Sequence, residues 1–197
     1  MNPIAPCILI IAVLLDLILG DPRRLPHPVV GIGRMITALE KLLRRLMRNE
    51  RLGGLLLLIT VVGSTAAITM LLVKGAYALH PYLAVAVSTW LSYTCLAARS
   101  LHRESKLVAD RLAAGDLEGA RELLSRIVGR DTGNLDEPEI WRALVETVAE
   151  NTSDGIIAPL FYLMLGGPVL GLAYKAVNTL DSMVGYKNER YLRFGWA

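Results

Sequence analysis

The pattern Asn-Thr-x-Asp occurs twice in this chain, over residues 151–154 and again over residues 178–181. Carboxylate and amide oxygens are hard ligands of the kind that Mg²⁺ prefers. Glu150 directly precedes the first copy and adds a further carboxylate. The residue types at the two motifs therefore predict a site for Mg²⁺, or for a nucleotide that carries it.

A helix with an acidic face leads into the first motif. Asp136 is a candidate N-cap, and Glu139 completes a capping box. Glu146, Glu150 and Asp154 follow at every fourth position, so they lie along one side of the helix. Like charges at this spacing cost about 0.2–0.5 kcal/mol per pair. The stripe is either a solvated acidic face or part of a cation site, and its continuation into NTSDG favours the cation site.

Basic side chains near the motifs supply partners for phosphate groups, with Arg as a planar fork and Lys as a point charge. The sequence has no GxxxxGK[ST] pattern, so an ATP site here is not a P-loop. The candidates are Arg23, Arg24, Arg130, Lys175, Lys187, Arg190 and Arg193.

The segment between the motifs decides whether they share one site. Residues 155–174 carry no charge, but Pro159 and the Gly-Gly-Pro triplet at 166–168 interrupt them. Such a triplet is a turn signal, and each half is too short to cross a bilayer alone. A re-entrant hairpin would place both motifs on one side of the membrane, whereas a single span would separate them. We favour the hairpin.

The composition predicts an integral membrane protein, with 53% hydrophobic and 20% charged residues. Residues 52–73 and 75–98 are uncharged, and each stretch exceeds the ~20 residues that a spanning helix needs. The apolar N-terminus, interrupted by Asp16, lacks a basic leader and a small-residue cleavage site, which favours a retained helix over a signal peptide. We therefore predict an all-α, polytopic membrane protein.

Charge and periodicity divide this protein into regions. Residues 1–98 form a membrane region with three transmembrane helices, in which the basic loop 20–51 is cytoplasmic by the positive-inside rule. Residues 99–150 form a cytoplasmic segment of three amphipathic helices, the second capped by Asp116. Residues 151–197 hold the re-entrant or spanning segment. No aromatic-basic repeat or DNA-binding motif is present, so a nucleic-acid partner is not expected.

A stiff loop with three prolines precedes the second apolar region. Its sequence, GDPRRLPHP, holds Asp21, Arg23, Arg24 and His27 in a restricted arrangement at the membrane surface. The loop is either an interface anchor or part of the polar site.

Two longer strings, ENTSDG and NTLDSMVGYKNERYLRFG, resemble the CobD or CbiB family of cobalamin-biosynthesis membrane proteins, and the resemblance runs from Asp16 to the last residue. These proteins are adenosylcobinamide-phosphate synthases. The resemblance implies an ATP- and Mg²⁺-dependent ligase of the cell inner membrane, with its active site on the cytoplasmic face. The family continues where this chain stops, which implies that its C-terminal part is missing here.

The implied reaction joins a propionate carboxyl of adenosylcobyric acid to the amine of (R)-1-aminopropan-2-ol O-phosphate or ethanolamine phosphate. The implied partners are these substrates, the lipid bilayer, and either other cobalamin-assembly proteins or further copies of this chain. The implied roles are catalysis by Asp154, Asp181 and Lys175; Mg²⁺ binding by Glu150, Asp154 and Asp181; orientation of ligands or phosphate by Asn151 and Asn178; phosphate binding by Arg130, Lys175 and Lys187; and lining of the site mouth by Asp21, Arg23 and His27.

Two other functions remain open at this level. An AmpE-like membrane sensor would have the same helices without ligase activity, but it has no physical need for the paired motifs with Lys175 and Lys187. A transporter built on half-helices would place polar residues near the membrane midplane, where 161–165 and 169–172 offer few.

Overall fold

The computed structural model describes residues 4–21 and 27–197, and this part of the chain is helical with no strand. The all-α prediction is therefore confirmed for the described residues. The elements are α1 (Ala5–Leu19), α2 (Pro28–Leu46), α3 (Glu50–Leu79), α4 (Pro81–Tyr93), α5 (Ala98–Ala113), α6 (Leu117–Ser125), α7 (Glu137–Thr152), the π-helix η1 (Ser153–Ile157) and α8 (Ala158–Val184).

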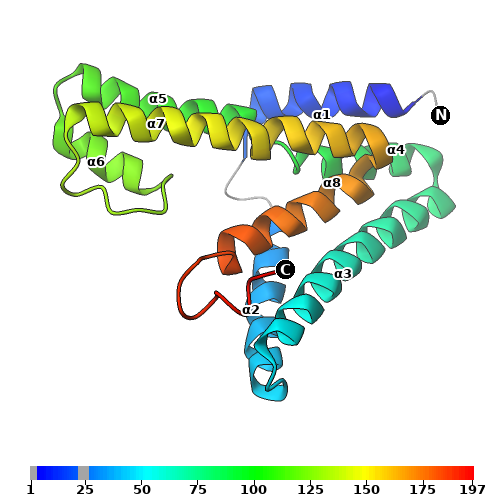
Figure 1. Cartoon of the computed structure of the whole chain (residues 1–197). Coiled ribbons are helices and arrows are strands. Elements are labelled where there is room, and N and C mark those ends of the chain that lie inside the picture. The colour runs from blue at the N-terminus through cyan, green and yellow to red at the C-terminus, as the bar shows by residue number, and fades with distance from the viewer. Residues whose placement is uncertain (1–3, 22–26) are drawn as a thin grey trace.

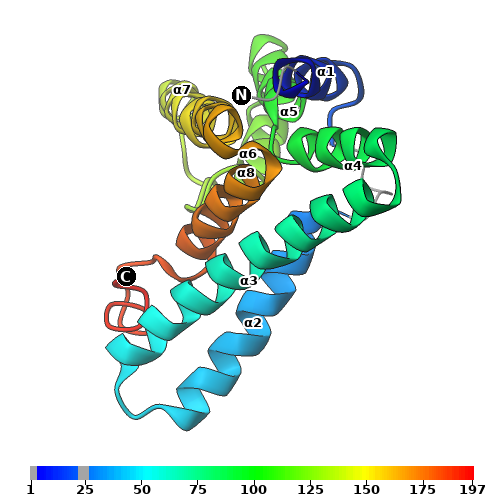
Figure 2. The same cartoon turned by 90° about the vertical axis from the view of Figure 1, so that its right-hand side faces the viewer.

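The helices form two arms that meet at an angle (Figures 1 and 2). One arm contains α5, α6 and α7, whose apolar faces pack around Val108, Leu124 and Ile140. The other contains α2, α3 and the later part of α8, packed around Ile36 and Leu57. The junction between the arms includes α4. A third apolar cluster lies there, and it joins Leu91 of α4 and Cys95 after it to Leu163 and Leu172 of α8.

The amphipathic helices predicted for 99–150 are confirmed. The Asp116 side chain accepts from the Gly119 N–H at 2.9 Å and caps α6. Asp136 and Glu139 form a reciprocal capping box at the start of α7, with both bonds at 2.9 Å. These caps fix where α7 begins, and hence which side chains its acidic face presents.

Two helical stretches are long and apolar enough to cross a membrane by length and composition, namely α3 and Glu137–Val184, and the second of them is broken at Gly166 and Gly167. The predicted helix over 75–98 is wrong, because α3 ends at Leu79 and α4 has only 13 residues. His80 is extended and caps α4 through the Tyr82 N–H, and Pro81 cannot donate the bond that would continue α3. With 15 residues, α1 is also shorter than the ~20 that a perpendicular span needs. The three predicted crossings within 1–98 thus reduce to one full-length candidate.

The prediction of a loop over the basic segment 20–51 is wrong, because 19 of its residues form α2. A Pro at the first helical position and the His27 side chain, which accepts from the Val29 N–H at 3.3 Å, start this helix. The amphipathic α2 packs its apolar side against α3 and α8. The prediction rested on the basic residues of this segment and did not use the helical spacing of its apolar residues.

The chain bends sharply inside α8. Gly166 and Gly167 have non-helical backbone angles, and Gly167 has φ 59° and ψ −153°. Across this bend the rings of Tyr162 and Tyr174 stack with their centroids 5.0 Å apart. The two halves of α8 therefore touch near the bend and diverge from it, so that the chain reverses, as Figure 1 shows. Entry of this bend into a membrane stays a prediction.

Candidate functional site

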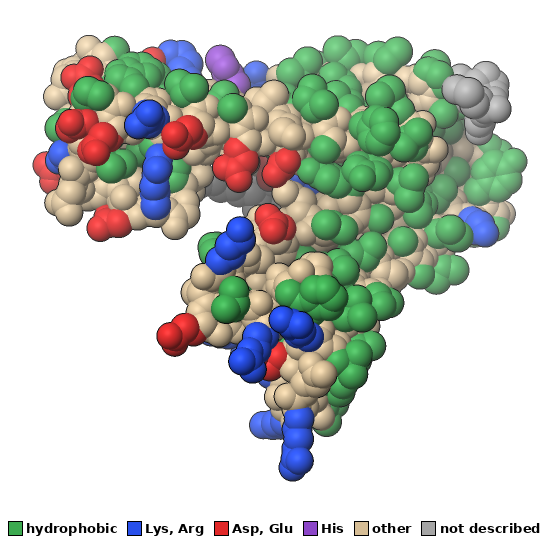
Figure 3. Space-filling model, viewed as in Figure 1, with side chains coloured by type: hydrophobic (Ala, Val, Ile, Leu, Met, Phe, Trp, Pro, Cys, Tyr) green, Lys and Arg blue, Asp and Glu red, His purple; other side chains and the backbone are tan. Residues whose placement is uncertain are grey.

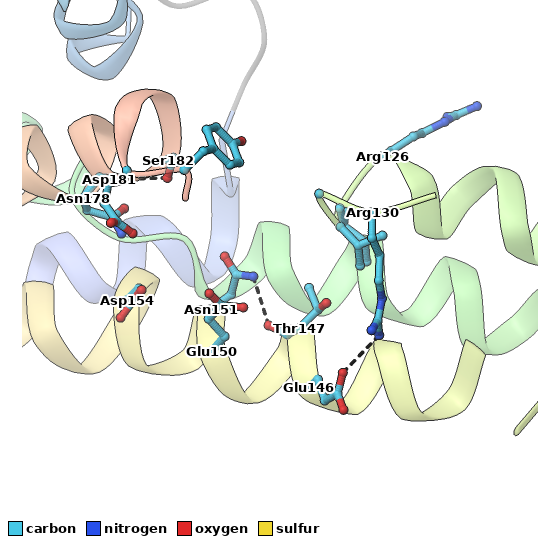
Figure 4. Close-up of a pocket in the computed structure, with 15 residues that line it drawn as sticks. Arg126, Arg130, Glu146, Thr147, Glu150, Asn151, Asp154, Asn178, Asp181 and Ser182 are labelled. Atoms are coloured by element: carbon cyan, nitrogen blue, oxygen red, sulfur yellow. Dashed lines mark hydrogen bonds and ion pairs between the residues drawn. The ribbon is translucent and has the colours of Figure 1, made fainter. Parts of the chain in front are cut away.

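A cleft of about 700 Å³ lies where the two arms meet, and both Asn-Thr-x-Asp motifs line it. The first motif reaches it from the end of α7 and the start of η1, and the second from the last turns of α8 (Figure 4). The reversal at Gly166–Gly167 is what brings the second motif back to the first. The polar side chains lining the cleft are Arg126, Arg130, Glu146, Thr147, Glu150, Asn151, Asp154, Asn178, Asp181, Ser182 and Tyr186.

The first motif contains a local change in helix type. Residues Ser153–Ile157 form a π-helix, and the Ala158 N–H bonds to the Ser153 carbonyl. A π-bulge is rare and is frequently found at functional sites. Gly155 within it is buried, and its carbonyl accepts from the Ala97 N–H at 3.1 Å, which ties the bulge to the start of α5. The bond to Ala97 therefore fixes the position of the first motif relative to α5.

Acidic side chains dominate the charge of the cleft. Glu146, Glu150, Asp154 and Asp181 line it against only Arg126 and Arg130 among the described residues. Acidic side chains gather at the hollow between α7 and α8 in Figure 3. Both arginines already have carboxylate partners, as Arg126 bonds to Glu122 at 2.6 Å and Arg130 to Glu146 at 3.0 Å. The cleft therefore has excess negative charge and favours a cation.

Three of the four acidic residues of the cleft form no ion pair within the described part of the chain. Glu150, Asp154 and Asp181 make none with any described residue, whereas Glu146 pairs with Arg130. The amide of Asn151 donates to the Thr147 carbonyl at 2.9 Å, which leaves its side-chain oxygen available as a ligand. The free oxygens therefore come from both motifs.

A metal cage built from protein alone is not present. No group of three His, Cys, Asp or Glu side chains within the described ranges is close enough to hold a metal ion. The predicted ligands Glu150, Asp154 and Asp181 share the cleft without forming such a cluster. Mg²⁺ does not require one, because it commonly binds through one or two carboxylates and completes its shell with water and substrate phosphate oxygens. The donor set fits Mg²⁺ in that mode.

Several predicted site residues lie outside the cleft. Lys187 is exposed after α8, and Lys175 lies one turn before the second motif without lining the cavity. Asp21 and His27 are also absent from its wall, with His27 Nε2 3.7 Å from Asp21 Oδ1. Arg23 and Arg24 fall outside the described residues.

Lys175 nevertheless links the cleft to the Asp21–His27 pair electrostatically. It interacts with Asp154 on the cleft side and with Asp21 on the loop side. Burial lowers the pKa of His27 and Lys175 lowers it further, although Asp21 acts in the opposite direction. His27 is therefore held neutral as the cap of α2, and Asp21 and His27 interact with Lys175 without lining the cleft.

The structure adds cleft residues that the sequence interpretation did not assign. Arg126 and Tyr186 gave no sequence signal, because one lies at the end of a surface helix and the other in an irregular segment. Glu146 belonged to the recognised acidic stripe and could have been included. Its pairing with Arg130 joins the loop after α6 to α7 at the edge of the cleft.

Comparison with known proteins gives consistent matches along nearly the whole chain. Residues 9–197 match the family described as CobD/Cbib protein. The chain is 66% identical over 193 residues to cobalamin biosynthesis protein CobD of Geobacter metallireducens, and this match covers 98% of the chain and 61% of that protein. It is 68% identical over 192 residues to CobD of Pelobacter propionicus, covering 98% and 59%. It is 50% identical over 188 residues to cobalamin biosynthesis protein CbiB of Salmonella typhi, covering 94% and 59%.

The chain thus spans about three fifths of the length of these curated relatives. No solved structure matches it.

Proposed function

The chain belongs to the CobD/CbiB protein family, and on that premise we propose that it acts in cobalamin biosynthesis as an adenosylcobinamide-phosphate synthase. The observation that carries the proposal is the meeting of both Asn-Thr-x-Asp motifs in one acidic cleft bordered by two arginines. A site that handles a metal-bound nucleotide and a phosphorylated amine needs this mixture of oxygen ligands and guanidinium groups.

The proposed reaction forms an amide bond at the expense of ATP. A propionate carboxylate of adenosylcobyric acid attacks the γ-phosphorus of ATP, and ADP leaves. The amine of (R)-1-aminopropan-2-ol O-phosphate, or of ethanolamine phosphate, then attacks the acyl carbon, and inorganic phosphate leaves. Such chemistry depends on holding the reactants in line and on compensating phosphate charge.

The residues of the cleft have separable roles in this proposal. Glu150, Asp154 and Asp181 would hold Mg²⁺, with the amides of Asn151 and Asn178 orienting these ligands or a phosphate group. When bound, the ion would supply charge compensation to the phosphoryl oxygens. Arg130 is positioned to meet a phosphate group at the edge of the cleft, in exchange for its bond to Glu146.

Lys175 has a different part. From its place between Asp154 and Asp21 it would compensate part of the negative charge of both carboxylates as a point cation behind the wall of the cleft. Lys187 would bind a phosphate group, and Asp21 and His27 would act at the mouth of the site; the same role for Arg23 stays a prediction, because Arg23 lies outside the described residues. We further propose a multi-pass position in the cell membrane, with the cleft on the cytoplasmic side.

The proposal is tested with the complete protein in detergent, supplied with Mg-ATP, adenosylcobyric acid and aminopropanol phosphate. Mass spectrometry detects the ligated corrinoid. Asp154→Asn and Asp181→Asn are expected to abolish the product, while Asp110→Asn, an exposed carboxylate paired with Lys106 on α5, keeps it. No product from folded wild-type protein with verified substrates would overturn the ligase assignment and favour a sensor without chemistry.

A further inference from the structure

A basic tip forms where α2 ends and α3 begins, far from the cleft. Figure 3 shows Lys and Arg side chains gathered at this lower end of the molecule. The proposed ligase chemistry makes no use of it. The tip contains Arg44, Arg45, Arg48 and Arg51, together with Arg190 of the segment that follows α8.

Part of this charge is neutralised by a buried carboxylate. Glu40 is only 7% exposed, and it accepts from Arg44 Nε at 2.9 Å and from an Arg190 guanidinium nitrogen at 3.2 Å. Arg44 also stacks over the ring of Phe194 at 4.2 Å from its centroid. These contacts fix the C-terminal segment against α2, and they commit Arg44 and Arg190 to internal roles.

The remaining charge faces a small cavity. A pocket of about 320 Å³ is lined by Arg44, Arg45, Met47, Arg48, Glu50 and Phe194. Arg45 and Arg48 are exposed and make no ion pair or side-chain hydrogen bond with any residue that the structure describes. Glu50, the acid in the wall, lies 3.5 Å from Arg44. The pocket therefore has two guanidinium groups in excess.

We propose that this pocket binds a phosphate group through Arg45 and Arg48. A guanidinium fork matches phosphate oxygens in geometry, and two uncompensated forks carry enough positive charge to compensate a phosphate mono- or diester. The ring of Phe194 and the side chain of Met47 complete the lining of the pocket.

The position of the pocket indicates the source of the phosphate. Above the tip, α3 exposes apolar side chains such as Ile59, Ile68 and Leu71, at 59%, 54% and 69%. If the bilayer core covers that surface, the tip lies at the depth of the lipid head groups, where anionic lipids attract clustered Lys and Arg. The phosphate of an anionic lipid and that of a soluble ester share the same chemistry, and the test below separates them.

The test uses the purified chain in detergent and native mass spectrometry with phosphatidylglycerol or phosphatidylcholine as the probe. Arg45→Gln with Arg48→Gln removes the proposed ligands, and Arg34→Gln with Lys74→Gln removes the same charge from exposed positions outside the pocket. We expect wild type to retain phosphatidylglycerol over phosphatidylcholine. The pocket variant should lose about tenfold or more of that affinity and the control about twofold or less.

A second arm adds millimolar inorganic phosphate to the wild-type complex. Displacement of phosphatidylglycerol assigns the pocket to soluble phosphate, and retention assigns it to a lipid head group. Both results support the phosphate site. Equal losses in the two double variants, or a wild-type protein that neither prefers phosphatidylglycerol nor binds inorganic phosphate, would overturn it, and the unfolding midpoint of each variant verifies that the exposed substitutions leave the fold intact.

Discussion

Asp154 and Asp181 belong to opposite halves of one bent helical stretch, and yet they line the same cleft. A straight helix over this stretch would place them far apart, because each residue adds about 1.5 Å of rise. Their proximity therefore depends on the backbone at Gly166 and Gly167, and the function of the cleft depends on a turn that lies at the far end of the hairpin.

Gly167 has backbone angles that only glycine adopts readily, with φ 59° and ψ −153°. We expect Gly167→Ala to destabilise the protein by about 1–3 kcal/mol, because an L side chain is strained there. Thermal unfolding in detergent measures the change, and product formation should fall with it as the second motif moves.

The matched control for that change is Gly63→Ala in the middle of α3, where an added Cβ meets nothing within 4 Å. Alanine in a regular helix should be neutral or stabilise by about 0.5–1 kcal/mol. Equal unfolding midpoints for Gly167→Ala and wild type would contradict a glycine-dependent turn.

Arg130 is shared between Glu146 and any phosphate that enters the cleft. Its bond to Glu146 is 3.0 Å long and both side chains are more than half exposed, so the ion pair itself contributes about 0–1 kcal/mol. We expect Arg130→Gln to weaken nucleotide binding about tenfold, and Glu146→Gln to leave it unchanged or strengthen it by freeing the guanidinium. Calorimetric titration with Mg-ATP measures both.

Arg142→Gln serves as the control in that series, because Arg142 lies 3.9 Å from the same Glu146 and does not line the cleft. If this variant weakens nucleotide binding as much as Arg130→Gln, the effect comes from general charge and not from a contact in the cleft.

The helices of 99–150 were predictable because local chemistry decides them. Asp116 and Asp136 stand at helix starts with suitable partners three residues later, and the structure has both caps. The Gly-Gly-Pro turn at 166–168 was also predictable from local chemistry, because glycine and proline disfavour a regular helix there. The π-helix at Ser153–Ile157 was not, since it depends on the Gly155 carbonyl bonding to a distant Ala97.

The composition of the cleft was only partly predictable. Glu150, Asn151, Asp154, Asn178 and Asp181 carried a repeated pattern, and all of them line it. Arg126 comes from the end of α6, and no local pattern specifies its meeting with the two motifs. The apolar run at 75–98 wrongly predicted one helix, because hydropathy does not register the break at Pro81 that divides the stretch.

The C-terminal segment depends on close contact with α3. An added Cβ at Gly54 would overlap the Phe194 carbonyl oxygen, which belongs to rigid backbone. We expect Gly54→Ala to displace residues 186–197 and to destabilise the protein by about 1–3 kcal/mol. Limited trypsin digestion should then cleave faster after Arg190 and Arg193, with the products identified by mass spectrometry.

Gly75→Ala in the same helix is the control, since its Cβ meets nothing within 4 Å. Unchanged cleavage rates in Gly54→Ala would show that the segment does not need this contact. Such a result would also remove Phe194 as a fixed wall of the basic pocket.

His27 makes the stability of the protein depend on pH in a predictable direction. Burial, the largest cause, and the nearby Lys175 lower its pKa from the ordinary value of 6.5, against the opposing effect of Asp21. Because the unfolded chain then binds more protons than the folded protein below that value, stability is full above about pH 6.5 and falls on acidification. His27→Asn keeps a side-chain acceptor for the Val29 N–H without a titrating group. Unfolding midpoints between about pH 8 and pH 5 should therefore decline more in wild type than in His27→Asn, and parallel curves for the two proteins would show that other groups cause the decline.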